Sequence, residues 1–375
     1  MSSPIPYGHQ SIDESDIAAV VDALKSEWLT MGPAVAEFEA ALTTESGAVG
    51  AVAVSNGTAA LHTAYAAMQL KPGDEVIVPP LTFVATAAGA ALHGATIVFA
   101  DIQEDTGNID PDAVEAAITD RTRAIAGVDY AGHPVDADEL SKLAQASGAL
   151  FLEDAAHSIA STYRGKPVGS LADVTTFSFF PTKNLTTAEG GAVVATDAGL
   201  LERARRFRSQ GMVRDGFRGE ADGAWWYEVP ELGLNYRLPD VLCALGLSQL
   251  KRLGEFKASR TRVFERYVDG LGDVDGITLP TRREYVDPTW HLFPLRIKDG
   301  QRRRVYDFLR ENDVLVQVNY IPVHWQPYFQ DLGFRRGQFP VSEQYYAEEL
   351  SLPMFASLTE PDQDRVIELV RKALR

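Results

Sequence analysis

The sequence has almost no cysteine and a shortage of basic residues. Cys243 is its one cysteine, so no disulfide can form within the chain, and a reducing compartment is the expected location. The 35 lysine and arginine residues are outnumbered by 52 aspartate and glutamate residues, which leaves a formal net charge of -17. A surface with that charge repels nucleic acid and anionic membranes, so we expect neither as a partner.

Long apolar runs are absent as well. No stretch approaches the ~18 apolar residues that are needed to span a bilayer. The first residues, MSSPIPYGHQ, lack the basic start and the apolar core of a signal peptide. We therefore expect a cytoplasmic protein. Apolar residues make up 45% of the chain and charged residues 23%, which is ordinary for a soluble globular protein. The 375 residues are more than one compact core usually holds, so we expect one large domain and one smaller domain.

Short β-branched runs alternate with helical patterns over the first 200 residues. The runs lie at 75–80, 96–102, 123–130, 149–156, 174–180 and 191–197. This alternation predicts an α/β fold with a mostly parallel, doubly wound sheet, in which ligands bind beyond the carboxyl ends of the strands. The glycine-rich and charged stretch 211–228 shows no period and predicts a long loop.

A second pattern begins after a long helical stretch at about 239–272. It contains the predicted strands HLFPLRI and VLVQVNY, a helix between them and a helix at the end of the chain. We expect a large domain over 1–250 that includes an N-terminal helix, and a small α+β domain over 251–375.

Reactive side chains follow two of the predicted strands. Asp154 ends the run LFLED, and His157 comes three residues later. Lys183 follows the run VTTFSFF. These positions predict an acid and an amine on the same rim of the sheet. Taken alone, Asp154 could instead cap a helix and Lys183 could be a solvated surface charge.

Two further motifs complete a possible site. SNGTAAL (55–61) predicts a helix start where the N–H groups of Gly57 and Thr58 favour an anion, although an ordinary capped helix explains it too. Phe83, in LTFVATA, could stack on a planar ligand or be buried. Together, a phosphate at a helix start, a carboxylate for a ring nitrogen, an aromatic over the ring and a lysine for an aldehyde describe a site for pyridoxal 5′-phosphate. No metal site is predicted.

Several motifs carry a family resemblance, and they occur in the right order. They are SNGTAAL, TFVATA, EDAAHS, FSFFPTKNLTTAEGG, ELGLNYRLPD, ALGLSQL and YIPVHWQPY. Over nearly the whole chain, the sequence resembles the DegT/DnrJ/EryC1/StrS family of sugar aminotransferases, which are pyridoxal-phosphate enzymes with the aspartate aminotransferase type fold (PLP fold type I). The stretches GVDYAGHPVD and AEELSLPMFASLT look most like the aminotransferases of pseudaminic acid biosynthesis, which act on a UDP-linked 4-keto-6-deoxy-N-acetyl hexose.

The resemblance implies roles around the cofactor. Lys183 would form the Schiff base, Asp154 would pair with the pyridine nitrogen, and His157 would lie near the 3-hydroxyl of the ring. Phe83 would stack on that ring. The positions that would hold the phosphate are Gly57, Thr58 and Ser178.

The resemblance also implies contacts with a second subunit and with the substrate. Asn235 would reach the phosphate of the other subunit's cofactor, so an obligate homodimer with shared active sites is expected. Phe180 stands where the family often has histidine, which leaves a substrate contact from that position in doubt. The positions that we expect near the substrate are Arg237 and His324, and the candidates for meeting a nucleotide's diphosphate are Arg214, Arg218 and Arg237.

We therefore expect a ping-pong transaminase that moves an amino group from an amino acid, with L-glutamate as the expected donor, to the C4 ketone of a nucleotide-linked 6-deoxy sugar. An aminotransferase for a cyclitol or another cyclic ketone is the main alternative. A dehydratase of the same fold would typically carry histidine in place of Lys183. A cofactor-binding sensor is the alternative from another class, and the complete catalytic set argues against it.

Overall fold

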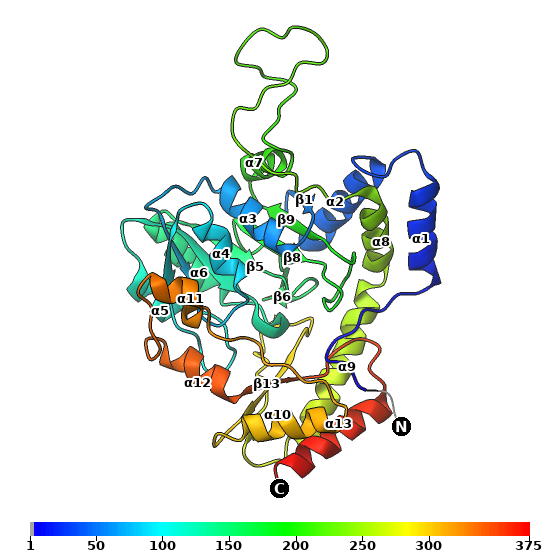
Figure 1. The fold of residues 1–375 in the computed structure, drawn as a ribbon, viewed down its shortest axis with the longest axis vertical. Coiled ribbons are helices and arrows are strands. Elements are labelled where there is room, and N and C mark those ends of the chain that lie inside the picture. Colours follow the sequence, from blue (N-terminus) through cyan, green and yellow to red (C-terminus); the bar gives the residue numbers. More distant parts are fainter. Residues whose placement is uncertain (1–3) are drawn as a thin grey trace.

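A seven-stranded sheet forms the centre of the computed structural model, which describes residues 4–375 (Figure 1). The strand order is β1-β9-β8-β5-β4-β2-β3. The strands are β1 (Gly50–Val54), β2 (Glu75–Val78), β3 (Thr96–Phe99), β4 (Thr122–Val128), β5 (Leu150–Asp154), β8 (Val174–Ser178) and β9 (Gly191–Ala195). Adjacent strands from β3 to β8 pair in parallel, whereas β9 runs antiparallel to both of its neighbours. The predicted mostly parallel sheet is confirmed.

Helices cover both faces of this sheet, and the strand sequences show why. Every residue of β1, β2 and β9 is buried, as expected for strands with no solvated face. In β2, Val76 and Val78 pack in the cluster that includes α3 (Gly57–Ala67) and α4 (Ala85–Ala91), whereas Ile77 packs with α5 (Pro111–Ala117) and α6 (Ala137–Ser147). The remaining helices around this sheet are α1 (Glu14–Lys25), α2 (Pro33–Ser46), α7 (Ala198–Arg208) and α8 (Asp240–Lys251).

The C-terminal part of the chain is built on a second, antiparallel sheet. Its strand order is β10-β12-β13, formed by β10 (Ile277–Thr278), β12 (Phe293–Ile297) and β13 (Glu349–Leu352). Its apolar side chains pack with those of α9 (Leu253–Leu271), α10 (Arg302–Glu311) and α13 (Glu360–Ala373). The other elements are β6 (Thr162–Tyr163), β7 (Lys166–Pro167), β11 (Val286–Asp287), α11 (Pro327–Asp331) and α12 (Pro340–Glu348). The division into domains at residues 250 and 251 stays a prediction.

The run VLVQVNY does not form the predicted strand. It makes isolated bridges, Val314 with Ile5 and Gln317 with Ser351, and its place in the sheet is taken by β13. Its side chains reach in two directions, since Val314 and Val316 join the C-terminal core while Gln317 and Asn319 line a cavity. The segment is therefore extended, and it links the C-terminal core to the cavity that Gln317 and Asn319 line.

A long loop between α7 and α8 extends away from the rest of the chain, at the top of Figure 1. We call residues 211–234 the projecting loop. One isolated bridge, Val213 with Glu228, joins its two sides. Trp225 and Leu232 are 72% and 89% exposed, so this loop presents apolar surface to its surroundings. Across residues 4–375, no helix has the length and apolar character needed to cross a membrane.

We predict that Gly191→Ala destabilises the fold. A Cβ at this position, where β9 passes between β1 and β8, would lie 2.5 Å from the backbone oxygen of Asn56 and 2.8 Å from that of Phe177. Because backbone cannot swing aside, we expect the free energy of unfolding in urea to fall by about 1–3 kcal/mol, the usual effect of overpacking. Gly254→Ala is the control, since a Cβ there meets no atom within 4 Å. Equal stability of Gly191→Ala and the wild type would contradict this account.

Candidate active site

A cavity of about 850 Å³ lies at the carboxyl ends of β5 and β8, beside the first turn of α3. Its position is the one expected for a ligand site in a doubly wound sheet. Seven of the predicted site residues line it, namely Gly57, Thr58, Phe83, Asp154, His157, Ser178 and Lys183. Phe180, the residue that departs from the family pattern, lines it too.

Lys183 lies in the turn that follows β8. Its N–H donates a 2.9 Å hydrogen bond to the carbonyl oxygen of Phe180. The next residue, Asn184, is buried and donates from its side chain to the carbonyl oxygens of His157 (2.8 Å) and Thr289 (2.9 Å). Burial lowers the pKa of the Lys183 amine to about 8, against the opposing charge of Asp154. An appreciable fraction of the amine is therefore neutral and nucleophilic near neutral pH.

Asp154 is the last residue of β5, and its carboxylate is held on both sides. Thr86, on α4, donates a 2.7 Å hydrogen bond to Oδ2, and the N–H of Ala156 donates to Oδ1 at 3.3 Å. Burial raises the pKa of the Asp154 carboxyl, and the bond from Thr86 is the largest opposing effect. A fixed, buried carboxyl of this kind suits a cationic ring nitrogen, whose charge would keep it ionised.

His157 is buried in an aromatic stack. Its ring centroid lies 4.3 Å from that of His291, and its Nε2 lies 3.1 Å from the hydroxyl of Tyr320. Burial places the pKa of His157 well below the ordinary value, with the charge of Lys183 acting in the same direction. The ring is therefore neutral. Its Nδ1 is buried and has no partner within residues 4–375, so it remains free to bond a ligand.

The start of α3 forms a cradle for an anion. Asn56 caps the helix by accepting a 2.8 Å bond from the N–H of Ala59, while the N–H groups of Gly57 and Thr58 have no acceptor in the described part of the chain. A Cβ on Gly57 would lie 2.7 Å from the Cβ of Ser178, so only glycine leaves this space open. Free N–H groups, a serine hydroxyl and the positive end of a helix dipole fit a phosphate.

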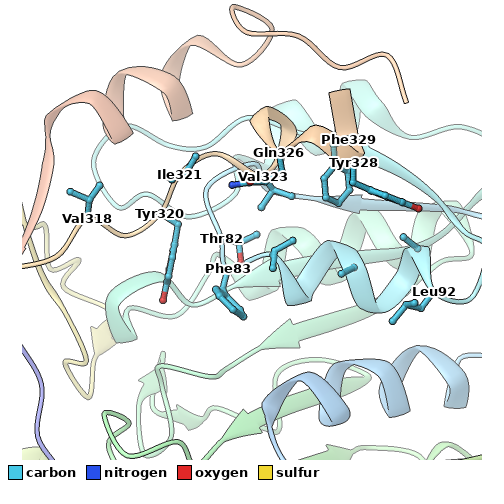
Figure 2. Close-up of a pocket in the computed structure, with 13 residues that line it drawn as sticks. Thr82, Phe83, Leu92, Val318, Tyr320, Ile321, Val323, Gln326, Tyr328 and Phe329 are labelled. Atoms are coloured by element: carbon cyan, nitrogen blue, oxygen red, sulfur yellow. The ribbon is translucent and has the colours of Figure 1, made fainter. Parts of the chain in front are cut away.

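Phe83 precedes α4, is 57% exposed, and lies with its ring centroid 6.0 Å from that of Tyr320. The two rings also line one end of a second hollow, the side groove, which has a volume of about 580 Å³. Figure 2 shows Leu92, Tyr328 and Phe329 towards its other end. No charged side chain is among the described residues that line the side groove.

The remaining predicted residues do not line the large cavity. Asn235 is exposed, and Arg237 donates a 2.7 Å bond to the side chain of Gln210. His324 is buried against Phe99 and Phe339 and lies 3.0 Å from a carboxylate oxygen of Glu343. The two arginines of the projecting loop, Arg214 and Arg218, are exposed. The roles of these residues, like those of the cavity residues, stay predictions.

Sequence reasoning missed several residues that line the cavity, including Tyr7, Thr176, His291, Asn319 and Tyr320. Tyr320 lay inside the motif YIPVHWQPY, so its position was available as a signal. Nothing near His291 or Tyr7 in the sequence indicated a ligand site. They reach the cavity because the segments before β12 and α1 fold across the end of the central sheet.

A buried amine beside a fixed carboxylate, with an anion cradle at a helix start and a flat aromatic ring nearby, defines the class of pyridoxal-phosphate enzymes on this fold. Residues 10–371 match the model of the DegT/DnrJ/EryC1/StrS aminotransferase family, and the chain belongs to that family. It is a PLP-dependent aminotransferase with PLP fold type I.

Similar proteins agree with this assignment. The UDP-4-amino-4,6-dideoxy-N-acetyl-beta-L-altrosamine transaminase of Campylobacter jejuni is 38% identical over 93% of this chain and 92% of its own. The structure of Helicobacter pylori PseC, an aminotransferase involved in the biosynthesis of pseudoaminic acid, is 34% identical with a TM-score of 0.93 and 99% of both chains covered. Spr1654 from Streptococcus pneumoniae in its PMP form is 30% identical with a TM-score of 0.92 and 98% of both chains covered.

We predict that Gly57→Ala weakens cofactor binding through the phosphate. The added methyl group would contact Ser178 and fill the cradle. The affinity for pyridoxal 5′-phosphate should fall by about tenfold or more, which corresponds to roughly 1.4 kcal/mol. Absorbance titration of the cofactor-free protein measures this. Pyridoxal without its phosphate is the matched control, and its affinity should change little. An equal loss for both ligands would argue against phosphate binding at Gly57.

Proposed function

We propose that the protein transfers an amino group from an amino acid, with L-glutamate as the expected donor, to the C4 ketone of a nucleotide-linked 4-keto-6-deoxy sugar. The observation that carries this proposal is the joint placement of Lys183, Asp154 and the start of α3 around one cavity, in a chain of the sugar aminotransferase family. The sugar is suggested by the Campylobacter jejuni relative, whose name describes a UDP-linked 4-amino-4,6-dideoxy sugar.

The residues of this chain have distinct tasks in that reaction. When bound, pyridoxal 5′-phosphate supplies an aldehyde for the amino group and an electron-withdrawing ring. Lys183 would hold the group at its aldehyde, and as a free amine would move a proton as a general base. Asp154 would keep the ring nitrogen protonated. His157, which is neutral, would lie near the 3-hydroxyl, and Gly57 and Ser178 would hold the phosphate.

Lys183 is suited to this task because its amine is not locked in the charged form. A lysine that is exposed at neutral pH is almost wholly protonated and neither attacks an aldehyde nor accepts a proton. Burial lowers the pKa of Lys183 to about 8, so reaction through the free amine should rise with pH through that value and level off above it. The polypeptide thus supplies the amine in the required form before any ligand arrives.

A homodimer with shared active sites would complete the site. Phe83 and Leu92, at the side groove, are 57% and 69% exposed, and Leu232 in the projecting loop is 89% exposed. Apolar surface of this kind is typical of an interface. Asn235 is exposed on the strand-like segment that leads back from the projecting loop, so it is available to a second subunit.

The diphosphate of a nucleotide sugar needs a local positive charge, because the chain as a whole carries -17. Arg214, Arg218 and Arg237 are the candidates. Arg218 lies beside Glu228, which accepts bonds of 2.7 Å and 3.1 Å from the N–H groups of Arg218 and Gly219. Backbone N–H groups therefore bind the carboxylate of Glu228. The guanidinium groups of Arg214 and Arg218 remain available for a phosphate from either subunit.

We predict that a panel of keto substrates will separate the sugar nucleotide from its rivals. UDP-, dTDP- and GDP-linked 4-keto-6-deoxy sugars and a keto-cyclitol are incubated with enzyme and L-glutamate, and products are detected by mass spectrometry. We expect amination of a nucleotide sugar, and none with Lys183→Ala or Lys183→Arg, because neither variant supplies a neutral amine. Turnover of the cyclitol alone would overturn the proposed substrate, and wild-type turnover by Lys183→Ala would overturn the mechanism.

We also predict that two inactive variants restore activity when their subunits are exchanged. Lys183→Ala lacks the amine, and Asn235→Ala lacks the expected contact with the other subunit's cofactor. In a hybrid dimer one of the two sites would be intact, so random exchange should yield about a quarter of wild-type activity, since half of the dimers are hybrids. The rate of amination is measured before and after exchange. Activity equal to the mean of the separate variants would show that the sites are not shared.

A further inference from the structure

Arg260, on α9, is a buried charged residue without a carboxylate partner in the described part of the chain. Its exposed fraction is 2%, and no aspartate or glutamate forms an ion pair with it among residues 4–375. Its guanidinium instead faces backbone carbonyl groups. Burying a guanidinium without a counter-charge is costly, so a buried arginine of this kind calls for a specific explanation.

The carbonyl groups that Arg260 contacts belong to three separate segments. Nη1 donates to the oxygens of Trp290 (3.2 Å), His291 (3.5 Å) and Met354 (3.2 Å). Nη2 donates to the oxygens of Thr182 (3.4 Å) and Lys183 (3.5 Å). One planar group therefore joins the turn that carries the lysine to the segments that precede β12 and follow β13. The fork of N–H groups on Nη1 and Nη2, which is the geometry of arginine, reaches all of these acceptors.

This guanidinium also lies close enough to the lysine to act on it electrostatically. Burial lowers the pKa of Arg260 to about 10, so it keeps its charge at neutral pH. A positive charge beside the amine of Lys183 disfavours a second positive charge there. The charge of Asp154 acts in the opposite direction.

We propose that Arg260 is a positioning residue for Lys183, whose guanidinium fixes the turn through the carbonyl groups of Thr182 and Lys183 and whose charge disfavours a proton on the amine. The proposal rests on the proposed role of Lys183 as the residue that bonds the cofactor.

Other groups face Lys183 from the elements packed around it. Asp154 lies at the end of β5, His157 lies in the turn after it, and His291 precedes β12. Burial holds the pKa values of both histidines well below the ordinary value, so neither carries charge at neutral pH. The other titratable groups that line the cavity are Tyr7, Glu189, Tyr236 and Tyr320. Arg260 is thus the cation whose effect on the amine of Lys183 opposes the effect of Asp154.

The test is the pH dependence of the rate at which the full-length chain, freed of cofactor, bonds added pyridoxal 5′-phosphate. The rate is followed by the growth of the visible absorption band, and only the neutral amine reacts. In the wild type the midpoint should lie at about 8. In Arg260→Met the midpoint should rise, and the rate at pH 7 should fall by roughly tenfold for each unit by which it rises. Arg260→Lys has one ammonium group in place of the guanidinium fork and contacts fewer of these carbonyl groups, so its rate should fall at every pH.

Arg262→Met is the matched control, because Arg262 lies on the same helix, is exposed and donates a 2.8 Å hydrogen bond to nearby Ser259. Its midpoint and rate should equal those of the wild type. Thermal unfolding checks that each variant is folded, and Arg260→Gln replaces Arg260→Met as the neutral variant if the latter does not fold.

An unchanged midpoint in the folded neutral variant, or a wild-type rate at every pH in Arg260→Lys, would overturn the proposal for Arg260. Lys183→Ala tests its premise separately. If that variant still forms the absorption band, the proposed role of Lys183 is contradicted, independently of the results for the Arg260 variants.

Discussion

The parallel pairing of β5 with β8 is the constraint on which the rest of the site depends. Asp154 pairs in register with Thr176, so the end of β5 and the end of β8 open onto one rim, and Lys183 follows in the turn after β8. The antiparallel β9 then passes back beside β8 and places Gly191 opposite Ser178. The carboxylate, the amine and the phosphate cradle are therefore held by backbone hydrogen bonds, and no flexible loop has to bring them together.

The parts of this arrangement that could be predicted are those with a local cause. Short apolar runs indicated β2, β4 and β5, and a glycine at a helix start indicated the anion cradle at Gly57. The strand β1 was missed because its sequence, GAVAV, is rich in alanine and glycine, which carry little strand preference. The run VLVQVNY had the composition of a strand, yet β13 pairs with β12 in its place. No local sequence pattern indicates which of these two segments will pair with β12.

The residues that reasoning from sequence missed share a physical cause. His291 and Arg260 are buried, and Tyr320 is half-buried, next to segments that are far away in the sequence. A sequence read one position at a time does not show which distant segments will cover a residue. The predicted residues outside the cavity show that a recognisable motif does not by itself place a residue in the site of one chain. Asn235 has a clear motif around it, but it is exposed in one chain, so its task would depend on a neighbouring subunit.

Burial acts on the central pair in opposite directions, raising the pKa of Asp154 and lowering that of Lys183, so that it favours the neutral form of both. Behind Asp154 lie the buried carboxyls of Asp129 and Glu153, and burial raises the pKa of both. An ionised Asp154 beside the amine raises the pKa of the amine and favours its protonated form. A chain with so large an acidic excess therefore gains from a cation beside the amine that cannot itself lose its proton near neutral pH. Arginine meets that condition and lysine at the same depth would not, since a buried ammonium releases its proton far more readily.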